Sequence, residues 1–144
     1  MTPKQQLTQL IEDSFKLQKF IFYGLGVVAG ITGMVILLLT FVMPVQPGEE
    51  TIVLGLQVTS VIFIIFAFWF PWFISQRLKA VKKIIFETPD QIAEVIPYTV
   101  TKRGIPGYAV RIKTKNNKTL GFNVAGPKTQ AKIVELISKQ YLVF

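Results

Sequence analysis

The chain has 144 residues, 51% of them hydrophobic, and carries a formal net charge of +8 at pH 7 with neither cysteine nor histidine. The lack of cysteine excludes disulfides, thiolate metal sites and cysteine nucleophiles, and the lack of histidine removes the commonest general base and metal ligand. Because phosphate loops, dinucleotide fingerprints and serine elbows are missing too, we expect no enzyme, no metal and no other cofactor.

Residues 1–19 predict a short amphipathic helix that begins at Thr2-Pro3, with proline at the first helical position. Apolar side chains recur along one face of this segment, and polar side chains cover the other. We expect the helix to lie on the cytoplasmic membrane interface or to pack on the C-terminal domain. The apolar positions are Leu7, Leu10, Ile11, Phe15 and Leu17.

Residues 20–74 contain two long apolar runs, 20–43 and 52–74, neither of which holds a charged residue. At about 1.5 Å per residue, each run is long enough to cross a hydrocarbon core of about 30 Å. The intervening loop is short. The segment therefore predicts a transmembrane helical hairpin.

The charges that flank the two runs predict the orientation of the hairpin. Lysines precede the first run, Glu49 and Glu50 occupy the loop, and four basic residues follow the second run. By the positive-inside rule both termini are cytoplasmic and the loop is outside. We expect a protein integral to a bacterial cytoplasmic (inner) membrane.

Small and polar side chains inside the runs are candidates for helix packing. Gly26 and Gly30 have the small-xxx-small spacing, and Gly33 follows nearby. They pack either against the partner helix of the same hairpin or against a second copy or another membrane subunit. Gln57 and Thr59 are candidates to hydrogen-bond across the hairpin to Thr40.

Residues 75–87 predict a basic continuation of the second helix into the cytosol, stopped by Thr88-Pro89. A strand from 92 to about 101 follows, which Pro97 would place at a sheet edge. Alternatively, Thr88 caps a short helix that ends near Pro97. The strand would turn one face inward, formed by Ile92, Ile96, Tyr98 and Val100.

Residues 108–115 and 119–124 alternate between apolar and polar positions and predict a β-hairpin. A three-residue loop at 116–118 would pair Val110 with Val124 and Ile112 with Phe122, which keeps one face apolar. The turn before this hairpin is expected at 104–107. The other face would then present Arg111, Lys113 and Lys115.

Gly126-Pro127 begins a last helix that runs to about Tyr141 and whose apolar stripe should cover the sheet. Residues 88–144 are thus expected to form a cytosolic α+β unit of three antiparallel strands and one C-terminal helix. The open sheet edge should be shielded by a second copy, by the cytosolic helix or by the membrane.

The predicted order of elements after the transmembrane pair is three strands followed by a helix. This order resembles the C-terminal half of bacterial pleckstrin-homology-like domains on small membrane proteins. Residues 108–115, 119–125 and the helix from Pro127 carry the resemblance. It implies a membrane-bound interaction module. Some bacteriocin-immunity proteins have a similar layout, which implies the alternative of an immunity function.

Residues 75–144 hold 13 lysines and arginines but only 4 acidic residues, so an acidic partner is expected. Our leading hypothesis is a non-enzymatic accessory module that docks an acidic protein or anionic lipid head groups, with a homodimer as a further option. Nucleic-acid binding is the alternative, although the predicted register puts Tyr98 and Tyr108 on the covered face, away from the positive charge. The candidate residues are Arg77, Lys79, Lys82, Lys83, Lys102, Arg103, Arg111, Lys113 and Lys115.

Overall fold

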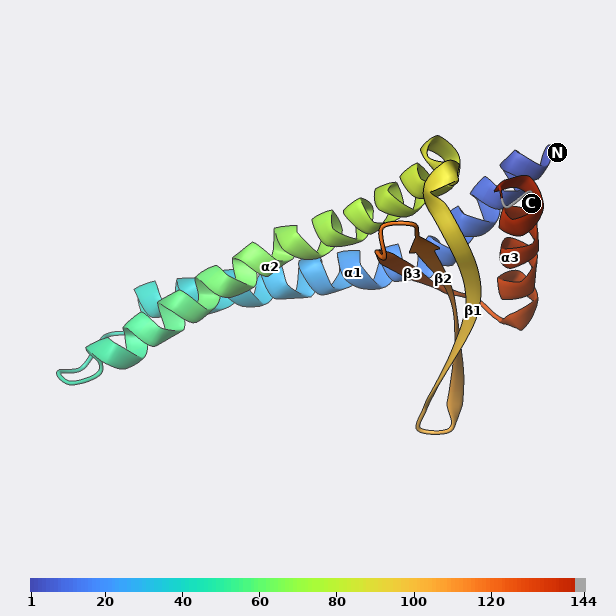
Figure 1. Cartoon of the computed structure of the whole chain (residues 1–144). Coiled ribbons are helices and arrows are strands. Elements are labelled where there is room, and N and C mark those ends of the chain that lie inside the picture. The colour runs from blue at the N-terminus through green and yellow to red at the C-terminus, as the bar shows by residue number, and fades with distance from the viewer. Residues whose placement is uncertain (142–144) are drawn as a thin grey trace. The chain divides into compact units, whose positions relative to one another are not determined.

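The computed structural model describes residues 1–141 and contains two long helices, a three-stranded antiparallel sheet and a C-terminal helix (Figure 1). The chain divides into two compact units. The apolar unit is Lys19–Ser75, and the basic unit is Met1–Gln18 with the chain from Gln76 onward. The elements are α1 (Pro3–Val42), α2 (Glu50–Lys82), a π-helical turn (Lys83–Glu87), a 3-10 turn (Pro89–Gln91), β1 (Ile92–Lys102), β2 (Ile105–Thr114), β3 (Thr119–Val124) and α3 (Pro127–Tyr141).

The first helix is longer than the sequence predicted. Its start is confirmed, since the Thr2 N–H donates to Gln5 Oε1 (2.9 Å) and the Gln5 N–H donates to Thr2 Oγ1 (3.3 Å), a capping box. However, α1 continues without a break to Val42. The expected separate helix over 1–19 is therefore the first part of one 40-residue helix. No glycine or proline lies near residue 19 to end it.

The β1–β2 turn is tighter than predicted. Arg103 and Gly104 form it, with φ of +51° and +78°, as a two-residue type I′ turn requires. The expected reversal over 104–107 was wrong, because Ile105, Pro106 and Gly107 already pair with β1. The twist of the type I′ turn matches that of the strands, so the hairpin closes on two residues.

A bulge at the start of β1 overturns the predicted face of that strand. Between Ile92 and Glu94 the register shifts, so Ile92 lies opposite Thr114 but Val95 lies opposite Ile112. The extra residue puts Val95 on the face of Ile92. The residues expected beside Ile92, namely Ile96, Tyr98 and Val100, are on the opposite face.

The β2–β3 hairpin has the predicted loop length but not the predicted pairing. Its loop is 115–117, closed by the Thr114 N–H donating to the Lys118 carbonyl (2.8 Å), and Asn117 takes the left-handed conformation with φ of +59°. Val110 therefore pairs with Phe122, and Val124 pairs with Tyr108. The prediction was wrong by two residues, a slip that leaves every side chain on its expected face.

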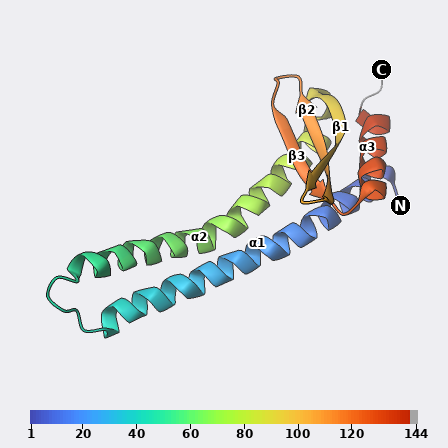
Figure 2. The ribbon, with the colours of Figure 1, turned by 90° about the horizontal axis from the view of Figure 1, so that it is seen from below.

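The core of the basic unit lies between the apolar face of the sheet and three helical segments. Val110, Ile112 and Phe122 supply the sheet side, and all are buried. The stripe on α3 covers this face as predicted, through Ile133 and Ile137, which are fully buried (Figure 2). The first turns of α1 and the end of α2 with its π-helical turn complete the core with the buried side chains Leu7, Ile11, Phe15, Leu78, Val81 and Ile85.

Both outer carbonyls in the middle of β3 are capped. Gly121 and Asn123 alternate with the residues that bond to β2, so their carbonyls face away from that strand. Arg77 donates to the Gly121 carbonyl (2.5 Å), and Gln18 Nε2 donates to the Asn123 carbonyl (3.3 Å). The helices thus shield this edge, one of the three options that the sequence left open.

In the apolar unit, α1 and α2 run side by side and expose most of their large side chains (Figure 2). Each helix has one most apolar stretch of 18 residues. In α1 22% of that stretch is buried, and in α2 taken together with its π-helical turn (Glu50–Glu87) 6% is buried. Neither is therefore a core helix of the described part of the chain. Both are long and apolar enough to cross a membrane.

Phe15 tests whether the first turns of α1 belong to the basic unit. Its ring is fully buried and stacks on Phe122 with centroids 5.7 Å apart. Phe15→Ala should lower the stability of the basic unit by about 3–5 kcal/mol and speed amide hydrogen exchange in β3, measured by mass spectrometry on the full chain in detergent.

Leu17→Ala is the matched control, because this side chain is 66% exposed and its loss should change stability by less than about 0.5 kcal/mol. Equal exchange rates in the two variants would show that α1 does not complete the core.

Candidate functional site

The sheet has a second face, which points away from the core. It carries the side chains that alternate along each strand with the buried ones. We call it the outer face. On β2 it presents Arg111 and Lys113, both exposed. The β1 positions paired with Arg111 and Lys113 are Ile96 and Glu94, so an exposed carboxylate lies opposite Lys113. Tyr98, Val100 and Lys102 continue the same face of β1, and Ile105 lies opposite Lys102 at the tip.

Tyr98 lies on the outer face under an arginine. The Arg111 guanidinium is 4.1 Å from the centroid of the Tyr98 ring, and the tyrosine is 40% exposed. The prediction that Tyr98 is covered was wrong, because the bulge in β1 reverses its face. Tyr108, by contrast, lies with Val110 on the covered face, as predicted.

Three further predicted basic residues lie on the outer face or at its ends. Lys102 ends β1, Arg103 forms the turn, and both are exposed. Lys115 is exposed too, but β2 ends at Thr114, so this lysine belongs to the β2–β3 loop rather than to the strand. Its N–H donates to the Gln91 carbonyl (2.9 Å), which ties the loop to the start of β1.

The four basic residues of the α2 end do not form one group. Arg77 is half-buried and donates to the β3 edge, and Lys82 forms an ion pair with Glu12. Both hold the basic unit together. Lys79 and Lys83 are exposed and face solvent.

The exposed side of α3 is less basic than its lysines suggest. Glu135 accepts a hydrogen bond from Lys139 (2.5 Å) and lies 3.6 Å from Lys132. The hydrogen bond from Lys139 and the charge of Lys132 hold the pKa of Glu135 below its ordinary value. The carboxylate thus stays charged between two lysines and reduces the positive charge of this side of α3.

In the apolar unit, α1 and α2 meet at glycines. A Cβ on Gly33 would lie 2.8 Å from the Ser60 carbonyl oxygen, and one on Gly26 would lie 2.8 Å from the Ala67 carbonyl oxygen. At Gly30 the nearest atom is Ala67 Cβ, at 3.2 Å. Of the two packing partners that the sequence allowed, the glycines contact the second helix of their own hairpin.

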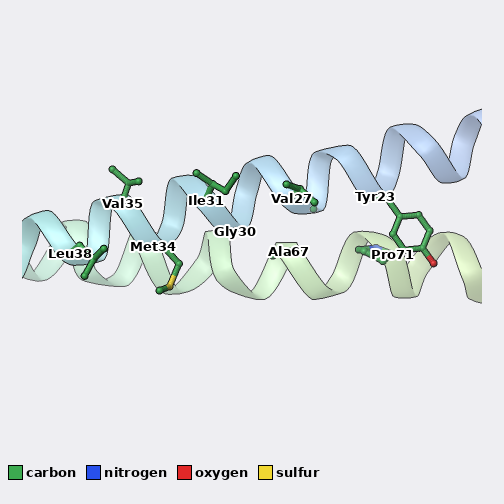
Figure 3. A pocket seen from close by; sticks show the side chains of 10 residues that line it. Tyr23, Val27, Gly30, Ile31, Met34, Val35, Leu38, Ala67 and Pro71 are labelled. Atoms are coloured by element: carbon green, nitrogen blue, oxygen red, sulfur yellow. The ribbon is translucent and has the colours of Figure 1, made fainter.

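A shallow apolar groove of about 500 Å³ runs along this helix contact. Figure 3 shows the residues that line it: Val27, Gly30, Ile31 and Val35 lie on α1, and Ala67 and Pro71 lie on α2. The groove has no charged side chain in its lining. Apart from the Tyr23 hydroxyl the lining is apolar, so the groove offers contact mainly to an apolar chain.

The expected hydrogen bond across the hairpin was wrong. Thr40 Oγ1 donates to the Leu37 carbonyl of its own helix (2.7 Å), and Ser60 Oγ donates to the Gln57 carbonyl (2.7 Å). Gln57 itself is half-buried. A hydroxyl within reach of the carbonyl three or four residues back bonds there rather than to the partner helix.

Sequence reasoning missed the contribution of Ile105 and Tyr98 to the outer face. The Arg103-Gly104 pair was a signal for the short turn that places Ile105 at the tip. Nothing in the sequence marks the bulge that turns Tyr98 outward.

Comparisons with protein-family models, with curated proteins and with solved structures found no match for this chain.

Glycine substitutions test the helix contact. Gly33→Ala should destabilise the apolar unit by about 1–3 kcal/mol, because the added methyl meets the Ser60 carbonyl and Ile64 Cγ1, 2.9 Å away. Thermal unfolding in detergent, followed by circular dichroism, measures the effect.

Gly24→Ala is the control, since a Cβ there has no neighbour within 4 Å. It should leave the unfolding temperature unchanged or raise it. The same loss in both variants would contradict the close contact at Gly33.

Proposed function

We propose that the protein is a membrane-anchored, non-enzymatic interaction module. The apolar unit anchors it as a two-helix hairpin in a bacterial cytoplasmic membrane, with both termini in the cytosol. The basic unit docks on an anionic surface, either an acidic partner protein or the inner leaflet, through the outer face.

The apolar unit supports the anchoring role. Exposed large apolar side chains surround α1 and α2 between residues 19 and 75. The polar side chains Thr40, Thr59 and Ser60 bond to the backbone of their own helices, which is the arrangement that lipid tolerates. Acidic Glu49 and Glu50 in the loop and basic residues after the second run support the proposed orientation.

The observation that carries the docking role is the charge of the sheet. From residue 92 to residue 124, the three strands and their turns contain six lysines and arginines and one acidic residue, Glu94, which lies opposite Lys113. Arg111 and Lys113 project side by side on the exposed outer face. A surface with an excess of positive charge attracts a surface of the opposite sign.

Nucleic-acid binding is a second candidate because Tyr98 and Arg111 lie together on this face. Single strands bind where aromatic rings stack on successive bases beside positive charge. Among the described residues the outer face provides one such ring, and the Arg111 guanidinium already covers part of it. We therefore rank this function second.

The test uses the full chain in nanodiscs of neutral lipid, titrated either with vesicles that contain anionic lipid or with a single-stranded oligonucleotide. Binding to the vesicles should weaken as salt rises. The double variant Arg111→Glu and Lys113→Glu should lower vesicle affinity at least about tenfold, since each basic residue near an anionic surface contributes about 1 kcal/mol.

Lys128→Glu, an exposed position at the start of α3, controls for net charge. If Lys128→Glu weakens vesicle binding by as much per reversed charge as the double variant does, the outer face is not the docking surface. Oligonucleotide binding without vesicle binding would favour the nucleic-acid function instead. Crosslinking in native membranes, with the same variants, then identifies an acidic protein partner.

A further inference from the structure

The β1–β2 hairpin extends beyond the rest of the sheet. The last β2 residue to pair with β3 is Tyr108, whereas β1 and β2 continue to pair through Val100–Gly107, Thr101–Pro106 and Lys102–Ile105. We call residues 100–107 the distal arm. Every residue from Thr101 to Gly107 is exposed, so the arm adds little to the core of the basic unit.

The tip of the distal arm combines an exposed apolar side chain with two cations. Ile105 is 73% exposed, more than any other large hydrophobic residue described in the basic unit except Met1. The turn at Arg103 and Gly104 fixes Lys102 and Ile105 as a facing pair. Water is a poor solvent for Ile105, and the adjacent charges prevent its burial against an ordinary apolar surface.

A hollow of about 520 Å³ lies beside the tip, where β3 ends and the edge of β2 is uncovered. Lys102 and Ile105 of the arm line it together with Pro106, Tyr108 and Val124. The lining is mostly apolar with a cation at the rim. A ligand that fits it has an apolar part next to a negative charge.

Membrane phospholipid is the anionic partner that presents both features. The sugar-phosphate backbone of a nucleic acid offers charge but nothing to cover Ile105. A leaflet offers phosphates at the level of Lys102 and Arg103 and acyl chains just below them. The basic unit is also joined to the apolar unit by continuous helices, through residues 18–19 and 75–76, with no linker. A leaflet crossed by those helices is present at high effective concentration.

We propose that the distal arm binds anionic phospholipid of the leaflet from which α1 and α2 emerge, with Ile105 entering the interface and Lys102 and Arg103 contacting phosphates. This inference rests on the proposed function, because it requires the apolar unit to cross a membrane. It goes further in assigning the partner of the arm as lipid rather than protein.

The chain contains no cysteine, so a single introduced thiol gives one labelling site. Thr101→Cys places an environment-sensitive fluorophore on the arm without replacing Ile105, Lys102 or Arg103. The full chain is reconstituted in nanodiscs that carry nitroxide-labelled lipid, with or without anionic phospholipid. In discs with anionic phospholipid we expect the nitroxide lipids to quench the fluorophore and its emission to shift to the blue. In zwitterionic discs most of the quenching and of the shift should be absent.

Matched controls come from the same sheet. A fluorophore at Asn116→Cys, in the β2–β3 loop at the opposite end of β2, should stay unquenched in both discs. Adding Lys102→Glu with Arg103→Glu, or Ile105→Ser alone, should reduce quenching at position 101 in anionic discs. The charge reversal should return it to the zwitterionic level.

Three results would overturn the inference. Equal quenching at 101 and 116 would mean a general surface contact rather than the arm. A chain that enters the discs but stays unquenched at 101 would remove the lipid assignment and leave the anchor intact; a protein crosslink at 101 in native membranes would then identify the occupant. A chain that enters no disc would refute the proposed function, and this inference with it.

Discussion

The exposed apolar surface of α1 and α2 is the constraint on which the account depends. Soluble monomers rarely expose continuous apolar patches of more than a few hundred Å². Here most of the large side chains of both helices are exposed along the apolar unit. The two helices cover each other along a narrow strip that includes Gly26, Gly30 and Gly33 and the ring contacts of Phe22. Something else must cover the remainder, and in our proposal it is lipid.

The same two helices build the basic unit. Residues at the start of α1 and the end of α2 bury their apolar faces under the sheet, and Gln18 and Arg77 cap the edge of β3. No linker therefore separates the apolar unit from the basic unit. A fragment that begins after the hairpin would lack Leu7, Ile11 and Phe15, so the docking surface has to be studied in the full chain.

Hydrophobic periodicity predicted which elements form. The two apolar helices, the three strands and α3 were all expected, because uninterrupted apolar runs, alternation and a Gly-Pro start are strong local signals, although α1 and β2 begin earlier than predicted. Register was not predictable in the same way. A slip of two residues between β2 and β3 keeps Ile112 and Phe122 on the covered face, so the pattern of apolar residues cannot tell the two pairings apart.

The candidate site was predictable in part. The sequence identified Arg111 and Lys113 as exposed neighbours, because alternation along β2 fixes their face. It did not reveal that Arg77 and Lys82 are used inside the basic unit, since their acceptors, the Gly121 carbonyl and Glu12, are distant in the chain. Nor did it place Tyr98, whose orientation depends on a bulge that has no compositional signal.

Cysteine accessibility in intact cells tests the central claim, which is that lipid surrounds the apolar unit and the basic unit faces the cytosol. The cysteine-free chain allows one thiol at Gln46, in the loop between α1 and α2, or at Asn116, in the β2–β3 loop. The account predicts that a membrane-impermeant reagent labels the first in intact cells and the second only after lysis. Labelling of position 116 in intact cells, or recovery of the chain in the soluble fraction without detergent, would contradict it.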